Sequence, residues 1–324
     1  MRRHRWFGPW IVSVILLLVA ASSLSAAETT WKVGLAKAKI TPEEPIWLAG
    51  YGGRDRPAEG TLHDLWIKVV ALEDAGGNRA VVLTSDLLGF PKNMYDEICA
   101  ELKTRCGLDR SQVMLTASHT HTGPVLNDAL YDIYPLDDEQ RAKIERYSVG
   151  LNKTVVETVA EALAQMSSGT LWAGEGTAEF AVNRRNNREP QISELRKQGL
   201  PLKGPVDHGV AVLSVRAPDE ALRAVVFGYA CHGTTLSFYQ WSGDYPGFAQ
   251  IALEQSHPGA LAMFHAGCGA DQNPLPRRTV EFCQQYGEML AAGVDDVLQK
   301  PMRPIAPRVQ TAIELLDLDF ERSL

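Results

Sequence analysis

The stretch Leu115–Pro124 reads LTASHTHTGP and places two histidines, His119 and His121, directly after an apolar segment. If the backbone is extended there, residues i and i+2 point to the same side, so both rings face one cleft. Neutral imidazole is a common zinc ligand, and the end of a buried strand holds such a ligand rigidly. An isolated His-x-His pair is more often a pair of ordinary surface histidines, so other segments must decide between these interpretations.

Polar residues also follow other apolar segments. YACHGTTL brings His232 to the end of one such segment, and MFHAGCGADQNP brings His265 and Asp271 to the end of another. Asp86 ends the segment LTSD, and Asp244 lies in a glycine-flanked turn that leads into a helix. Polar clusters at the ends of several apolar strands are the usual place of function in α/β folds, which favours the functional interpretation of the histidine pair.

The whole chain predicts a layered α/β fold in which β-sheets are covered by helices. Segments rich in Val, Leu, Ala and aromatic residues predict strands, and several are apolar on both faces, as in a covered sheet. The predicted strands are 65–73, 79–86, 112–118, 170–176, 209–216, 223–231 and 260–266. Gly-Gly-Asn between the first two predicts a hairpin turn. Apolar residues at three-to-four spacing, with suitable end signals, predict helices at 91–107, 137–166 and 279–298.

The two ends of the chain carry separate expectations. Residues 1–27 have a basic start, an apolar core and small residues at Ser25 and Ala27, the layout of a secretory signal peptide. The competing interpretation is an uncleaved membrane anchor, and both predict an exported protein, either periplasmic or secreted or held at the membrane. Residues 28–324 then form one domain. The final segment 306–324 alternates like a strand, so either the domain ends on an edge strand or a C-terminal part is missing from the sequence.

Composition excludes some partners. The 324 residues carry a net charge of −7, with a pI of about 5.7, which argues against nucleic acid as the main partner. Five cysteines occur without a Cys-x-x-Cys motif. Cys99 and Cys106 would lie about 10 Å apart on one helix face, too far for a disulfide. The cysteines are therefore interpreted mainly as buried apolar residues, with at most one or two bridges in an oxidising compartment.

Taken together, these segments resemble the neutral/alkaline non-lysosomal ceramidases. HTHTGP at His119–Pro124 is similar to the family's HTHSGP, HGTTL at His232–Leu236 to its HxTSM, and GDYPGFA at Gly243–Ala249 to its GDxxGxA. Weaker matches of the same kind are Asn183-Arg184, Asp207, Gly50–Gly52 and Gly60–His63. The resemblance runs from about Lys37 to Asn273 and implies the N-terminal catalytic domain of a divergent member, with its C-terminal part incomplete.

The resemblance also implies a chemistry. Enzymes of this family use one zinc ion to cleave the amide bond of ceramide, giving sphingosine and a fatty acid. The resemblance implies that His119 and His232 are zinc ligands and that His121 orients the site or contacts substrate. It further implies that Arg184 contacts the developing oxyanion or the product carboxylate. The implied partner is a small-molecule or lipid amide, with association to a membrane surface as an accompanying expectation; the sequence leaves the oligomeric state open.

The sequence departs from the family's pattern at two points. The family's GDxSPN turn carries a serine at the reaction centre, whereas GADQNP here has Asp271 or Gln272 near that place. The family's other two zinc ligands, a Glu and a Tyr, belong to a more C-terminal region and have no assigned position here. The candidates for a further ligand in this chain are Asp86, Asp244, Asp271 and His265, with Asp271 preferred because the glycine turn brings it to the same edge.

The predicted function is an exported, zinc-dependent hydrolase of C–N (amide) bonds. Without the serine, water would attack directly, with His121 or Asp271 as the base and Arg184 stabilising the oxyanion. Three alternatives remain open: a hydrolase of a different amide or ester, a catalytically degenerate or truncated ceramidase-like protein, and an anchored structural protein.

Overall fold

The computed structural model describes residues 30–318, so the predicted signal peptide or anchor at 1–27 lies outside the described residues. Within 30–318, no helix combines the length and the apolar character that crossing a bilayer requires. The fold is a mixed β-sheet with helices, which confirms the predicted layered α/β class.

Nine strands form the main sheet, in the order β11-β9-β8-β6-β1-β3-β4-β5, with β13 pairing beside β6. Within this sheet only the pairs β4–β5 and β9–β11 are parallel. The strands are β1 (Trp31–Lys39), β3 (Trp66–Glu73), β4 (Arg79–Ser85), β5 (Val113–Leu115), β6 (Ser167–Thr177), β8 (Gly209–Arg216), β9 (Leu222–Tyr229), β11 (Leu261–Ala266) and β13 (Arg303–Ile305). The predicted hairpin is confirmed as β3–β4, whose turn is held by the Asp74 carboxylate.

The sheet bends so that its two halves lie against each other. Val70 of β3, Val226 of β9 and Met263 of β11 belong to one buried cluster between the halves. Lys68 of β3 crosses the same interface, where its Nζ donates to the carbonyl of Ala262 and to the Glu254 carboxylate at 2.7 Å each. The two outer faces of the bent sheet are therefore left for helices.

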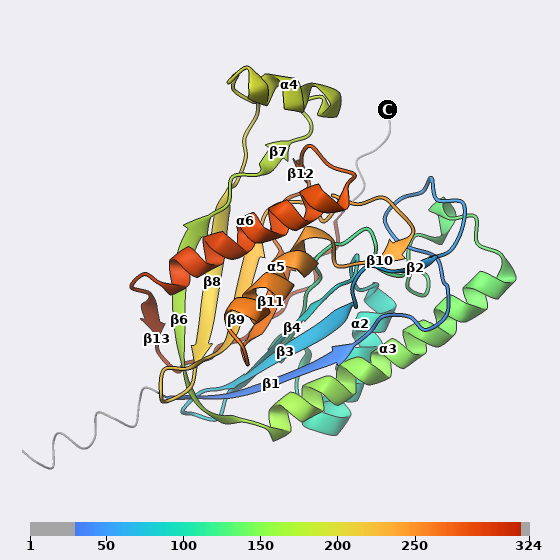
Figure 1. The fold of residues 1–324 in the computed structure, drawn as a ribbon. Helices are drawn as coiled ribbons and strands as arrows, with labels where there is room; N and C mark the ends of the chain where they lie inside the picture. The colour runs from blue at the N-terminus through green and yellow to red at the C-terminus, as the bar shows by residue number, and fades with distance from the viewer. Residues whose placement is uncertain (1–29, 319–324) are drawn as a thin grey trace, which may run out of the picture.

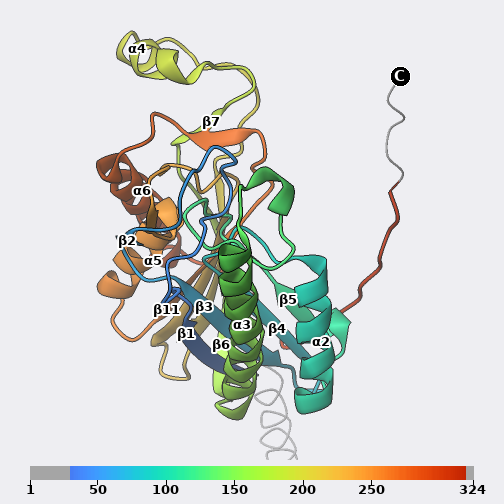
Figure 2. The same ribbon diagram turned by 90° about the vertical axis from the view of Figure 1, so that its right-hand side faces the viewer.

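Four helices cover these faces and produce a helix–sheet–sheet–helix arrangement (Figures 1 and 2). On the half containing β1, β3 and β4 lie α2 (Lys92–Cys106) and α3 (Asp138–Ala164). On the other half lie α5 (Asp244–Ser256) and α6 (Val280–Leu298). Because each half of the sheet packs on both sides, its strands are apolar on both faces, as their sequences indicate.

Smaller elements lie at the end of the sheet that carries the predicted site. Two short pairs form there, β2 (Gly60–Thr61) with β10 (Gln240–Trp241) and β7 (Ala181–Asn183) with β12 (Gln272–Pro274). Between β7 and β8 the chain forms a lobe that carries α4 (Ile192–Lys197) and projects from the body (Figure 1). Short 3-10 helices are present at Arg110–Gln112, Tyr131–Ile133 and Glu189–Gln191.

Two strand predictions are corrected. The predicted strand 112–118 is shorter, Val113–Leu115, although the N–H groups of Thr116 and Ser118 still donate to the β4 carbonyls of Leu83 and Ser85 before the histidine loop begins. The predicted strand in 306–324 is wrong over 306–318, where no strand forms and Leu315, Leu316 and Leu318 are exposed; residues 319–324 lie outside the described part. Alternating apolar and polar residues suit a strand, but a strand also needs a neighbouring strand to pair with. In the C-terminal part of the described chain, only Arg303–Ile305 pairs, with β6.

The cysteines agree with their predicted packing role. All five lie in the described part of the chain and none forms a disulfide. Cys99, Cys231 and Cys283 are buried, Cys106 is half-buried and Cys268 is exposed.

Breaking the Lys68 contact tests the bent sheet. Lys68→Met leaves the Glu254 carboxylate without its close partner, and because Glu254 is only partly buried the expected cost is about 3 kcal/mol, at the lower end for a broken buried pair. Lys37→Met removes an exposed partner 3.6 Å from the same carboxylate and should cost less than about 1 kcal/mol. Urea unfolding of both variants measures the difference; equal costs would contradict the role of Lys68.

Candidate metal centre

Three imidazoles converge at one end of the sheet. His119 and His121 come from the loop after β5, and His232 comes from the loop after β9. One nitrogen from each ring lies within 4.8 Å of the other two, and this is the one such group of metal-ligand side chains found in residues 30–318. The ring centroids are 5.0 Å apart for His119 and His232, and 5.1 Å apart for His119 and His121.

The backbones of the two histidine loops touch directly. Thr120 and Gly233 form a parallel β-bridge, and the His121 N–H donates to the Gly233 carbonyl at 3.0 Å. A Cβ on Gly233 would lie 3.1 Å from both the His119 carbonyl oxygen and the Thr120 Cα, so a glycine allows this close approach. His119 has a φ of +57°, an uncommon conformation for a non-glycine residue that points to a functional constraint.

Hydrogen bonds fix the tautomers of two histidines. The Nδ1 of His119 lies 2.8 Å from the Leu88 carbonyl, and the Nδ1 of His232 lies 2.8 Å from the Gly269 carbonyl. A carbonyl only accepts, so each Nδ1 carries the proton and each Nε2 keeps a free lone pair. Histidine ligands of metals are oriented in this way, and the donor set therefore fits a zinc ion.

His121 completes the group in a different environment. Both of its ring nitrogens are shielded from solvent and have no hydrogen-bond partner among the described residues. Burial, followed by the neighbouring His119 and His232, lowers the pKa of His121 to about 3, so its imidazole is neutral and free to donate a lone pair. Gly50 has a φ of +91°, and a Cβ there would lie 2.4 Å from the His121 ring, so the glycine makes room for this imidazole.

A buried arginine, which the sequence did not reveal as functional, holds this loop. Arg54 is 4% exposed, and its Nη2 donates to the His121 carbonyl at 2.6 Å while its Nη1 donates to the Phe238 carbonyl at 2.8 Å. Its guanidinium also stacks over the rings of Tyr51 and Tyr239. In the sequence, Arg54 lies in a polar glycine-rich run that resembles a solvated loop.

Arg184 and Asp271 lie beside the group but are not members of it. The Arg184 N–H donates to the Asp271 carbonyl at 2.8 Å, and the Arg184 side chain is exposed. The Asp271 carboxylate accepts from Asn183 Nδ2 at 3.0 Å. Their catalytic roles stay predictions, and the third position in the group belongs to His121.

The other candidate ligands are also engaged elsewhere. The His265 ring packs against Gly228, and burial lowers its pKa. The buried Asp86 carboxylate accepts from the Trp66 N–H and from Gln250.

Arg277 is a further positive charge that the sequence did not single out. Its Nη1 donates to the Thr234 carbonyl at 3.2 Å, two residues after His232, and its guanidinium pairs with Glu189 of the lobe. The only sequence signal is the Arg277-Arg278 pair itself, which does not distinguish a functional cation from a surface one.

Two adjoining cavities lie at the histidines. One, of about 310 Å³, is lined by His119 and His232 together with Leu88 and the glycine turn at Gly267–Ala270. The other, of about 400 Å³, is lined mainly by apolar side chains from three loops. Its apolar lining includes Ala49, Leu88, Phe90, Pro124, Leu126, Ala129, Leu130 and Tyr134. Leu88 lines both cavities, so the apolar cavity lies next to the one at the histidines.

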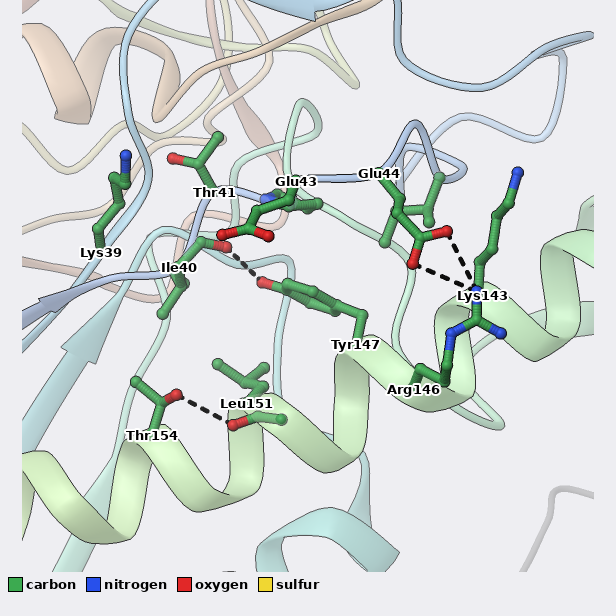
Figure 3. A pocket seen from close by; sticks show the side chains of 13 residues that line it. Lys39, Ile40, Thr41, Glu43, Glu44, Lys143, Arg146, Tyr147, Leu151 and Thr154 are labelled. Atoms are coloured by element: carbon green, nitrogen blue, oxygen red, sulfur yellow. Dashed lines mark hydrogen bonds and ion pairs between the residues drawn. The ribbon is translucent and has the colours of Figure 1, made fainter.

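A cleft of about 360 Å³ lies between residues 39–46 and α3 (Figure 3). Its walls carry the Glu44–Arg146 ion pair and the Tyr147 hydroxyl, which donates to the Ile40 carbonyl at 2.7 Å (Figure 3). It shares no lining residue with the two cavities at the histidines.

Known proteins resemble this chain in both sequence and fold. Residues 31–273 match the N-terminal part of the neutral/alkaline non-lysosomal ceramidases. The chain belongs to this family. The neutral ceramidase of Pseudomonas aeruginosa is 24% identical to this ceramidase-family chain over 276 residues, which are 81% of this chain and 40% of that protein.

Solved structures agree on the fold. The crystal structure of the Pseudomonas aeruginosa neutral ceramidase superposes with a TM-score of 0.70 at 21% identity and covers 86% of this chain and 46% of the other. A structure described as ceramidase complexed with C2 gives 0.72 at 21% identity, covering 86% and 45%. The ceramidase-family chain thus spans less than half the length of these relatives.

Substituting Gly50 tests the packing around His121. Gly50→Ala places a methyl group against the imidazole and should weaken zinc binding by at least about tenfold, as loss of a residue supporting a ligand does. Gly77→Ala is the matched control, because Gly77 also has a positive φ (+82°) but open space around its Cβ position. Calorimetric zinc titration of both variants should separate them; equal affinities would show that Gly50 does not set the ring's position.

Proposed function

We propose that this protein is an exported, zinc-dependent hydrolase of amide bonds that acts on a lipid amide. The observation that carries the proposal is the convergence of His119, His121 and His232, with two Nδ1 protons already engaged by backbone carbonyls. Membership of the ceramidase family supports hydrolysis as the reaction class. Export rests on the signal-like residues 1–27 and is part of the proposal.

His119 and His232 would hold the metal through Nε2, and His121 would complete the set. A zinc ion bound there would polarise a substrate carbonyl and lower the pKa of water. His121 suits a ligand better than a base, because a general base works best with a pKa near the working pH and that of His121 is about 3.

The remaining steps fall to the residues beside the histidines. Asp271 is the proposed acceptor of the proton from the attacking water, and Arg184 the proposed donor to the oxyanion or product carboxylate. The pairing of β7 with β12 supports these roles, because the Arg184 N–H donates to the Asp271 carbonyl and the next residue, Gln272, accepts from the His232 N–H. Arg277 adds a second positive charge on the same side.

The apolar cavity supports a hydrocarbon-bearing substrate. Leu130 lines this cavity with 52% of its surface exposed and a φ of +58°, two unfavourable features that a substrate-binding rim would explain. The cavity shares Leu88 with the cavity at His119 and His232, and the proposal is that a hydrocarbon chain lies in it with its amide near the metal. Approach from a membrane surface is proposed with this substrate, and the net charge of −7 argues against nucleic acid.

Zinc binding is the first test. We expect one zinc ion per chain by elemental analysis, hydrolysis of an N-acyl amide that a chelator abolishes, and restoration of hydrolysis by added zinc. His119→Ala and His232→Ala should each lose stoichiometric zinc, whereas His257→Ala, whose ring pairs with Asp295, should keep it. Wild-type protein that stays metal-free in the presence of excess zinc would overturn the proposal.

Chain-length dependence tests the substrate class. Ala129→Trp should fill the apolar cavity and lower kcat/KM for a long-chain N-acyl amide by at least about tenfold, while a short-chain N-acetyl substrate is little affected. Ala129→Ser keeps the cavity open and should leave the long-to-short ratio near that of the wild type. An unchanged ratio of long-chain to short-chain kcat/KM in Ala129→Trp would show that the cavity does not bind the substrate. Hydrolysis of esters but not of amides would show that the substrate class is different.

A further inference from the structure

The two threonines of the His-Thr-His-Thr run are completely buried in a hydroxyl network. Thr120 and Thr122 both have 0% exposure, and each Oγ1 donates to the carbonyl of Ser242, at 2.9 and 2.7 Å. The Ser242 hydroxyl lies 2.8 Å from Thr122 Oγ1, and the Ser242 N–H donates to the Thr122 carbonyl at 3.2 Å. The loop that carries His119 and His121 is thus hydrogen-bonded to Ser242 through both threonines.

Two residues later, the Asp244 carboxylate is attached to the other histidine loop. Its Oδ1 accepts from the Thr235 N–H at 3.0 Å, and its Oδ2 accepts from the Leu236 N–H at 2.8 Å. Thr235 and Leu236 follow His232 in the same loop. Asp244 is 0% exposed and has a φ of +55°, a strained conformation that the surrounding hydrogen bonds hold in place.

The turn Ser242–Asp244 is therefore hydrogen-bonded to both histidine loops. The Thr120–Gly233 bridge joins these loops directly, and Arg54 links them through the His121 and Phe238 carbonyls. The turn supplies a further, fully buried attachment of both loops, through Ser242 and Asp244. Together these attachments fix both the separation and the relative orientation of the loops, which a metal site requires within narrow limits.

We infer that Asp244 is a positioning residue of the metal centre, and that the Ser242–Asp244 turn sets the spacing between His232 and the His119–His121 pair. The inference rests on the proposed function insofar as zinc is the ion that this spacing serves. Asp244 also accepts from the Tyr245 N–H at 2.8 Å, a local contact at the start of α5, but its other two backbone donors belong to the His232 loop.

The carboxylate is specifically suited to this place. Because both of its oxygens accept backbone N–H bonds, neither can be replaced by a donor without opposing an N–H group. Asp244→Asn has nearly the same volume but converts one acceptor into a donor. It should therefore displace the His232 loop without creating a cavity.

The matched control is Asp74→Asn. Asp74 is 6% exposed and accepts from the N–H groups of Gly76, Asn78 and Val309, a comparable number of backbone donors far from the histidine loops along β3 and β4. We expect Asp244→Asn to weaken zinc binding about 10- to 100-fold in a chelator competition assay, as loss of an outer partner of a ligand does, and Asp74→Asn to leave it unchanged. The visible spectrum of the cobalt-substituted protein should change only in Asp244→Asn. Wild-type affinity and spectrum in a folded Asp244→Asn would overturn the inference.

A second pair of variants serves if Asp244→Asn does not fold. Thr122→Val removes the hydroxyl that donates to Ser242 and keeps the shape, whereas Thr122→Ser keeps the hydroxyl. We expect weakened zinc binding in the first and rescue in the second. Equal affinities in the two variants would count against the inference.

The inference and the proposed function fail in different ways. If wild-type protein binds no zinc, the proposed function is wrong. The environment of the histidines can then be measured in metal-free protein by NMR of the imidazole Cε1–Hε1 groups. Resonances of His119 and His232 that move in Asp244→Asn but not in Asp74→Asn support the turn's role. Resonances that move in neither variant overturn it.

Discussion

The contact between the backbones of Thr120 and Gly233 is the constraint on which the candidate site depends. It joins two loops that are far apart in the sequence, and the three imidazoles meet because this bridge brings their loops into register. A side chain at position 233 would crowd the bridge, and His119 next to Thr120 adopts a left-handed backbone. Such local costs persist only where the surrounding fold enforces them.

The bent sheet provides that enforcement. The parallel pairs β4–β5 and β9–β11 lie at opposite edges of the sheet, and the bend brings these edges together. Their ends are joined where the Ala266 N–H donates to the Ala117 carbonyl at 3.1 Å. Lys68 and the apolar cluster between the halves stabilise the same closure. The position of the histidines is thus a property of the whole sheet rather than of one loop.

The charge around the histidines gives the site a distinct character. Three neutral imidazoles would leave the charge of a divalent ion uncompensated, and the nearby guanidinium groups of Arg54 and Arg277 add to it. An environment of this kind stabilises negative charge that develops on a substrate carbonyl and on a released carboxylate. The Asp271 carboxylate, the proposed proton acceptor, accepts from Asn183 Nδ2.

Sequence patterns were sufficient for the elements that depend on neighbouring residues. The helices α2, α3 and α6 follow from apolar spacing and end signals, and the β3–β4 hairpin follows from its glycine turn, because these signals act over a few residues. His119 and His232 were found because each follows an apolar segment within a motif similar to that of the family. The sequence by itself therefore determined the layered α/β class and two of the three imidazoles as predicted ligands.

Only the tertiary structure decided which groups meet. The meeting of the His119–His121 pair with His232, the buried Arg54 and the hydroxyl network around Ser242 all depend on contacts between loops that are distant in the sequence. In the sequence, Arg54 looks solvated and residues 306–318 look like a strand. Burial and pairing depend on what the rest of the chain places opposite a residue, and no local pattern contains that information.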